Sequence, residues 1–181
     1  MNTFTEGSLI FEHNEHNCDC IKFDENIAHI KVKDVISTKG VDFIYLHEKN
    51  KIIFIEVKNF RGHTSDPKTK ERLKSNAEEL MTEIAIKVRD SMACGMSAAR
   101  FSTNDEDFWK LFGEIFLKVK TPIRIIAWIE FDESNPKEKK TKMAAWNNKL
   151  KQKLSWLHPV RISVNNIDNP PMIDGIRVRF R

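Results

Sequence analysis

Apolar residues along this chain follow two periods, one typical of strands and one typical of helices. Two short runs, Val41–Leu46 and Ile52–Val57, are rich in β-branched and aromatic residues and flank a short polar segment. Such runs predict the two neighbouring strands of a hairpin. By the same pattern, further strands are expected over residues 8–12, 18–23, 123–131, 160–164 and 175–181.

Helical spacing of the apolar residues is clearest in three later segments. One stripe runs continuously from Pro67 to about Ala93, and Gly95 is expected to end that helix. A second stripe covers Phe108–Val119 and follows Thr103–Glu106, which has the capping-box pattern. A third, basic helix is expected over about Glu138–Leu157.

The elements follow the order strands, helices, strand, helix and closing strands, and residues 24–39 fit neither period. This order predicts an α/β fold in which a mixed β-sheet is flanked by helices. With 181 residues, of which 40% are hydrophobic and 31% charged, the chain is expected to form a single domain over residues 1–181. Its formal charge of +4 permits an anionic partner without requiring one.

The sequence lacks the signals of membrane insertion and of secretion. No apolar run approaches the ~20 residues needed to span a bilayer, and the first residues lack the basic and then apolar layout of a secretory signal. The three cysteines form no regular framework of the kind that disulfide-bonded secreted domains carry. We therefore expect a cytoplasmic protein with reduced thiols and no membrane association.

Three charged residues lie at one end of the predicted hairpin, where Asp42 opens the first strand and Glu56 and Lys58 close the second. Side chains alternate between the faces of a strand, so Glu56 and Lys58 emerge on the same side. A three-residue loop over 48–50 would place Asp42 opposite Glu56, with Cβ atoms roughly 5 Å apart. A two-residue loop would instead put Asp42 on the other face. Two carboxylates that close repel each other unless a cation or a proton lies between them.

This pattern resembles the active-site signature of the PD-(D/E)XK nuclease superfamily, the restriction-endonuclease-like phosphodiesterases. The signature consists of an Asp, an apolar strand and then Glu-x-Lys. The residues here are Val41-Asp42 and Glu56-Val57-Lys58, and the Pro that usually precedes the Asp is absent. A fainter resemblance covers most of the chain: Glu56–Arg61, followed by a long helix that contains Lys87–Asp90, is similar to a group of small bacterial proteins with an EVK-x-[FY]-R segment. The resemblance implies a restriction-endonuclease-like αβββαβ core.

This resemblance also implies a chemistry, the metal-dependent hydrolysis of phosphodiester bonds, with DNA favoured over RNA. Asp42, Glu56 and the backbone carbonyl of Val57 would hold Mg²⁺ or Mn²⁺, because Mg²⁺ prefers hard oxygen ligands. Lys58 would orient or polarise the attacking water, or stabilise the charge that develops at phosphorus. The simpler alternative is that Glu56 and Lys58 are solvated residues at a strand end.

Several further residues are candidates for supporting this site. Superfamily members often carry an additional upstream acidic residue, for which the sequence offers three candidates: Glu6, Glu12 and Glu25. Further candidates lie just past the motif, at Asn59 and Arg61, and along one border of the following helix, at Glu83 and Lys87, where a solvated helix edge is the simpler interpretation. Glu83 and Lys87 lie one turn apart and could simply pair with each other.

Basic residues in the last third of the chain are candidate phosphate contacts, although a solvated surface is the simpler interpretation. They are Lys139, Lys140, Lys142, Arg177 and Arg179. A separate cluster of possible zinc ligands comprises His13, His16, Cys18 and Cys20. Its spacing is unlike that of a zinc knuckle, so a structural zinc is not expected.

A second class of function is consistent with the same residues. The chain could be a catalytically silent module with a nuclease-like fold that binds nucleic acid or a protein partner, for example as a subunit of a DNA-processing or phage-defence system. Such a module would show salt-sensitive binding without turnover. Homo-oligomer formation is compatible with either class.

Overall fold

The computed structural model describes residues 2–74, 76–121, 123–173 and 175–181, which form two β-sheets and five helices. The larger sheet has the order β3-β4-β5-β6-β7, with β3 (Cys18–Lys22), β4 (Phe43–His47), β5 (Lys51–Asn59), β6 (Ile123–Glu130) and β7 (Val160–Asn165). The smaller sheet has the order β1-β2-β8, with β1 (Asn2–Glu6), β2 (Leu9–His13) and β8 (Ile176–Phe180). The helices are α1 (Ile27–Lys33), α2 (Pro67–Arg72), α3 (Glu78–Phe101), α4 (Glu106–Phe116) and α5 (Pro136–Lys153).

The predicted hairpin is present and its register is the one that a three-residue loop requires. Strands β4 and β5 pair antiparallel, with His47 opposite Lys51 and Phe43 opposite Ile55. The turn between them includes Glu48, whose φ of 51° lies in the left-handed region. Continuing the register by one residue places Asp42, which directly precedes β4, opposite Glu56.

The second half of the larger sheet is parallel, and its central strand β6 is buried on both faces. Strand β6 pairs in parallel with β5 on one side and with β7 on the other. The almost unbroken apolar sequence of β6 follows from this position, because such a strand contacts apolar layers above and below. One layer is the helix-side core, which includes Phe54 and Ile125, and the other is the inter-sheet core, which includes Ile53 and Trp128.

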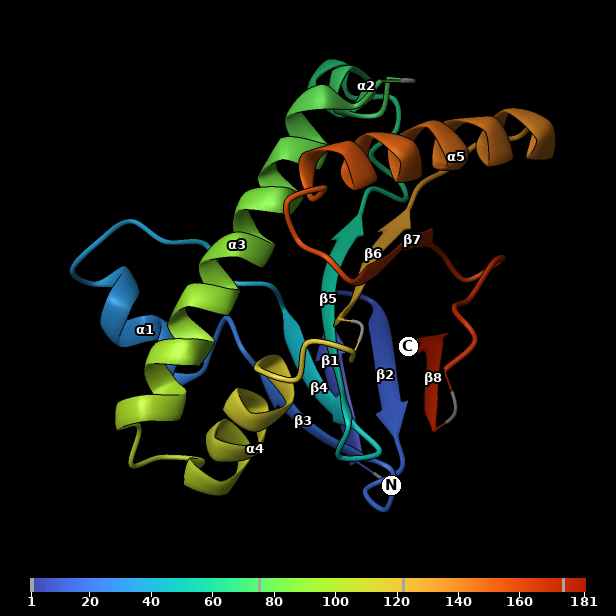
Figure 1. Cartoon of the computed structure of the whole chain (residues 1–181). Coiled ribbons are helices and arrows are strands. Elements are labelled where there is room, and N and C mark those ends of the chain that lie inside the picture. The colour runs from blue at the N-terminus through green and yellow to red at the C-terminus, as the bar shows by residue number, and fades with distance from the viewer. Residues whose placement is uncertain (1, 75, 122, 174) are drawn as a thin grey trace.

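Helices cover only one face of the larger sheet, which corrects the expectation of one sheet with helices on its faces. Figure 1 shows α1, α3 and α4 on one side of that sheet and β1, β2 and β8 on the other. Leu9 and Phe11 of β2 are fully buried in the inter-sheet core, next to Phe43 of β4. The strand β1 and the separate sheet that it forms were not predicted from the sequence.

The long helix expected from Pro67 to Ala93 is instead two helices. Helix α2 ends at Arg72 and α3 begins at Glu78, after Ala77 in a left-handed conformation. The carbonyl of Lys74, between the helices, accepts a hydrogen bond of 2.9 Å from the Trp146 indole, so a side chain of α5 satisfies a group that a continuous helix would have used itself.

The expected end of this helix at Gly95 is also wrong, because α3 continues to Phe101. A Cβ on Gly95 would lie 2.8 Å from ring carbons of Phe112, so this glycine allows α4 to pack closely on α3. None of the helices in the described ranges combines the length and the apolar character that a membrane crossing requires.

Two further segments differ from the sequence-based expectation. The ambiguous residues 24–39 contain helix α1, whose N-cap Asn26 accepts a hydrogen bond from the backbone of Ala28. The expected capping box before α4 does not form, because Asp105 is the N-cap residue and makes no side-chain cap bond. Its carboxylate accepts a hydrogen bond of 2.9 Å from Asn26 instead, which links α4 to the start of α1.

Candidate active site

Asp42 and Glu56 lie at the same end of the β4–β5 pair and are both buried, with 5% and 1% of their surface exposed. The Asp42 carboxylate accepts a hydrogen bond of 2.5 Å from the backbone N–H of Val57. This bond fixes the first carboxylate to the strand that carries the second one. The hairpin therefore brings together the acidic residues that the sequence motif predicts.

Two lysines neutralise part of the charge on Glu56. Lys58 Nζ lies 3.0 Å from Glu56 Oε1, and Lys87 Nζ lies 2.7 Å from the same oxygen. Lys87 also approaches Asp42, with Nζ 3.6 Å from Oδ1. The ammonium group of Lys87 thus lies between the two carboxylates, where a cation is required to limit their repulsion.

Helix α3 supplies both Lys87 and Glu83 to this site, so the structure brings these two predicted supporting residues to the motif. Glu83 Oε1 lies 2.9 Å from Lys58 Nζ, and the other Glu83 oxygen accepts a hydrogen bond from Arg72. Lys58 is held between Glu56 and Glu83 by these contacts. Glu83 and Lys87 do not pair with each other as an isolated helical ion pair would; each instead bonds to the motif on β5.

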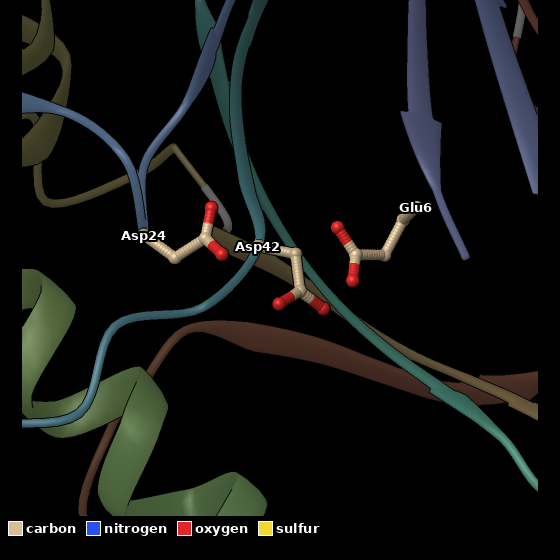
Figure 2. A group of neighbouring side chains, drawn as sticks. All are labelled: Glu6, Asp24 and Asp42. Carbon is tan, nitrogen blue, oxygen red and sulfur yellow. The ribbon is translucent and has the colours of Figure 1, made fainter.

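A group of three carboxylates lies on the other side of Asp42. One oxygen from each of Glu6, Asp24 and Asp42 lies within 4.8 Å of the other two. Figure 2 shows the Glu6 and Asp24 side chains pointing toward Asp42 from opposite sides. Glu6 ends β1 and Asp24 follows β3, so three separate parts of the chain meet here.

Only one of the three upstream acidic candidates reaches this group. Glu6 is part of it, although Lys22 lies 3.1 Å from its carboxylate. Glu12 lies 2.7 Å from Arg179, and Glu25, which is outside the group, lies 2.6 Å from the same Lys22. Sequence reasoning missed Asp24. In the sequence, Asp24 comes directly after the strand expected over residues 18–23. That position indicates a role in the site only once β3 is known to pair with β4, where the Phe23 N–H donates a hydrogen bond to the Asp42 carbonyl.

The buried carboxylates hold protons more tightly than usual. Burial, followed in effect by the charge of Asp42, raises the pKa of Glu56 from 4.5 to about 7, although Lys87 and Lys58 oppose the change. Burial likewise raises the pKa of Asp42 from 3.8 to about 6, against the opposing effects of Lys87 and the Val57 N–H. The two lysines therefore leave part of the desolvation and repulsion uncompensated.

At Lys58, the neighbouring charges outweigh the effect of burial. Burial alone would lower the pKa of Lys58, but Glu56 and Glu83 outweigh it and hold the pKa above its ordinary value. Burial would raise the pKa of Glu83, but its bonds to Lys58 and its proximity to Arg72 hold that pKa low. Lys58 is thus a protonated ammonium and Glu83 an ionised carboxylate near neutral pH.

These residues fit a hard divalent cation such as Mg²⁺ or Mn²⁺, which binds carboxylate oxygens. Asp42 lies near Lys87 on one side and near the carboxylates of Glu6 and Asp24 on the other. The oxygens of these three acidic residues converge on one position. The raised pKa values of Asp42 and Glu56 mark negative charge that nearby lysines only partly offset. A divalent ion would offset more of that charge than a monovalent ammonium does.

Two other predicted supporting residues lie apart from the carboxylates. Asn59 donates a hydrogen bond of 2.7 Å to Ser8 Oγ on the side of the smaller sheet. Arg61 lies 3.6 Å from Asp132 and stacks on the Phe180 ring at 4.5 Å. Both residues connect the end of β5 to neighbouring loops and strands.

The basic residues of the last third do not form one surface. Lys139, Lys142 and Arg179 are each paired, with Asp168, Glu133 and Glu12 respectively. The two remaining candidates, Lys140 and Arg177, are exposed on different elements, α5 and β8. Within the described ranges, the Glu6 group is the only cluster of possible metal ligands, so His13, His16, Cys18 and Cys20 do not converge on a common position.

Comparison with known proteins gives no match for this chain, whether against family models, curated proteins or solved structures.

Proposed function

We propose that this chain is a Mg²⁺- or Mn²⁺-dependent phosphodiesterase of the PD-(D/E)XK type, with DNA favoured over RNA as substrate. The observation that carries the proposal is the register of β4 and β5, in which Asp42 lies opposite Glu56 and Lys58 shares the face of Glu56. The proposal assigns the metal to these carboxylates and the substrate phosphate to the vicinity of Lys58.

The order of the elements around this hairpin supports the proposal. Antiparallel strands β3, β4 and β5 are followed by helix α3 and then by the parallel strand β6, as in the βββαβ part of a restriction-endonuclease-like core. Before β3, the described chain has the β1–β2 pair in the place of the first helix of that core.

The carboxylates have distinct positions in the proposed reaction. Asp42, anchored by the Val57 N–H, would be the central metal ligand, with Glu6 and Asp24 beside it. Glu56 and the Val57 carbonyl would complete the protein ligands, as the superfamily signature implies. A bound divalent ion would lower the pKa of a coordinated water and offset charge on the phosphate oxygens.

Lys58 would act as a hydrogen-bond donor rather than as a base. Its ammonium is held by Glu56 and Glu83, and its pKa is raised, so it keeps its proton at neutral pH. A fixed, protonated ammonium can orient the attacking water or bind a non-bridging phosphate oxygen, where negative charge increases in the transition state. Glu83 is a positioning residue for Lys58 in this scheme.

The test is a cleavage assay on linear duplex, circular duplex and single-stranded DNA with Mg²⁺, Mn²⁺ or EDTA. Asp42→Asn and Lys58→Met are each expected to lower the cleavage rate by on the order of 100-fold or more, as the loss of one transition-state contact does. Lys110→Met removes an exposed lysine of α4 and is the matched control. Cleavage at the wild-type rate in both site variants, or in EDTA, contradicts the proposal.

One observation favours the alternative of a silent binding module. Lys87 already places a cation between Asp42 and Glu56, so the carboxylates have partial neutralisation without metal. Such a module would bind DNA or a protein partner, for instance as a subunit of a DNA-processing or defence system. It predicts salt-sensitive DNA binding without turnover, and the same affinity in Lys58→Met as in the wild type.

A further inference from the structure

Two arginines lie directly opposite each other at the start of the parallel strands. Arg124 of β6 is paired in register with Arg161 of β7, and Ile53 of β5 continues the same row. Neighbouring strands are about 4.8 Å apart, so the two side chains leave the sheet next to each other. Like charges in directly opposite positions destabilise a sheet.

The described residues provide neither arginine with an acidic partner. Arg124 donates one hydrogen bond, from Nη1 to the carbonyl of Met172 at 3.0 Å. A guanidinium has five N–H donors, so most of its donors remain. Arg124 is half-buried, and burial together with the charge of Arg161 lowers its pKa. Within the described ranges, two positive charges therefore lie side by side without an acidic partner, one on the half-buried Arg124 and one on the exposed Arg161.

These arginines open into a cavity of about 360 Å³ between the larger sheet and the segment that precedes β8. Its other lining residues are His47, Glu48, Lys51, Ile53, Met172 and Ile173. The single acidic residue among them, Glu48, lies 2.5 Å from Lys51 and so balances that lysine. Among the described lining residues, the positive charge of both arginines thus remains without an acidic partner, and the partial burial of Arg124 strengthens the field that an anion would feel there.

We propose that this cavity is a phosphate-binding site in which Arg124 and Arg161 together hold one phosphate group. Guanidinium groups match the geometry of phosphate oxygens and bind them in bidentate fashion. The phosphate belongs either to a small phosphate ester or to a nucleic-acid backbone, which share this chemistry. The site is independent of the proposed nuclease centre, because Ile53 faces the inter-sheet core, whereas Glu56, three residues further along β5, faces the opposite side of the sheet.

Inorganic phosphate is the first probe, added in EDTA at constant ionic strength with chloride as the balancing anion. It is expected to raise the melting temperature of the wild type and to bind measurably by calorimetry. Arg161→Gln is expected to weaken phosphate binding at least tenfold. It should also raise the melting temperature without phosphate, because it removes the repulsion with Arg124.

Weaker phosphate binding together with a higher melting temperature in Arg161→Gln distinguishes a binding site from an arginine that only stabilises the fold. Arg161→Lys, which keeps the charge but loses the guanidinium fork, is expected to bind with intermediate affinity. Arg100→Gln removes an exposed arginine outside the cavity and is the matched control for general charge effects. Absence of phosphate binding by the wild type, or equal losses in Arg161→Gln and Arg100→Gln, overturns the proposal.

Competition identifies the source of the phosphate group. A nucleoside 5′-monophosphate and a short single-stranded DNA are each titrated against bound inorganic phosphate, still in EDTA. Displacement by the oligonucleotide assigns the site to a nucleic-acid backbone, and displacement by the mononucleotide alone assigns it to small phosphate esters. Because no metal is present, the result is separate from the success or failure of the cleavage assay.

Discussion

Replacing Glu56 by glutamine is expected to change how the stability of the protein depends on pH. Glu56 is 1% exposed, and its pKa is raised to about 7 from 4.5. Between these two values the folded protein binds more protons at this residue than the unfolded chain does. The free energy of unfolding therefore falls as pH rises through this window, and the penalty is complete above the folded-state pKa.

The size of the effect follows from the two pKa values. Integrated from pH 5 to pH 8, a pKa of about 7 in the folded state and 4.5 in the unfolded state costs the wild type about 2–3 kcal/mol. The glutamine side chain of the Glu56→Gln variant does not titrate. Relative to the wild type, the variant should thus gain this amount of unfolding free energy between pH 5 and pH 8, whatever its absolute stability.

Chemical denaturation of both proteins at several pH values measures this difference, because the titrations of residues distant from Glu56 are common to both proteins. Glu114→Gln, an exposed position of α4, is the matched control and should show no trend. A stability difference between Glu56→Gln and the wild type that stays flat, or that falls as pH rises, would refute the argument that Glu56 is desolvated and incompletely neutralised.

Three further outcomes are expected from the same structure. Mg²⁺ should raise the melting temperature more at pH 8 than at pH 5, because protons compete with the ion for the carboxylates at the lower pH. Asp42→Asn should abolish this increase. An equal increase at both pH values would count against carboxylate ligands. Lys87→Met should tighten Mg²⁺ binding about tenfold or more in calorimetry, because it removes a cation that competes for the same carboxylates. Weaker Mg²⁺ binding by this variant would show that Lys87 helps to hold the ion in place. Gly95→Ala should lower the unfolding free energy by about 1–3 kcal/mol through its clash with Phe112, 2.8 Å away, relative to Ser97→Ala on the exposed face of α3.

Local patterns in the sequence were sufficient for most individual elements of the fold. The β-branched and aromatic runs Val41–Leu46 and Ile52–Val57 predicted a hairpin with two possible registers, and the structure has the one that belongs to the three-residue loop. Features that depend on distant residues were not predictable in this way. The break before α3 depends on Trp146 of α5, and the continuation of α3 through Gly95 depends on Phe112 of α4. A separate sheet of β1, β2 and β8 likewise joins opposite ends of the chain.

The same limit applies to the candidate site. The proximity of Asp42 and Glu56 could be anticipated for a three-residue loop, because a hairpin is a local structure whose register follows from one loop. Glu83 and Lys87 were expected only at the border of the site, and their direct bonds to Lys58 and Glu56 depend on how α3 packs across the sheet. Asp24 could not be identified at all, because its role depends on the pairing of β3 with β4.

The two candidate functions differ in what neutralises Asp42 and Glu56, and Lys87 is the residue at which they diverge. Its ammonium reaches both carboxylates, at 3.6 Å and 2.7 Å, so a metal that binds both must displace it or share them with it. The pKa of each carboxylate stays raised although Lys87 reaches both of them and Lys58 also contacts Glu56. A divalent ion could therefore stabilise the ionised carboxylates further. Glu6 and Asp24 each add repulsion to Asp42 and raise its pKa further, and Lys22, 3.1 Å from Glu6, offsets part of that charge. This convergence of three acidic residues is why we propose the metal-dependent function ahead of the silent module.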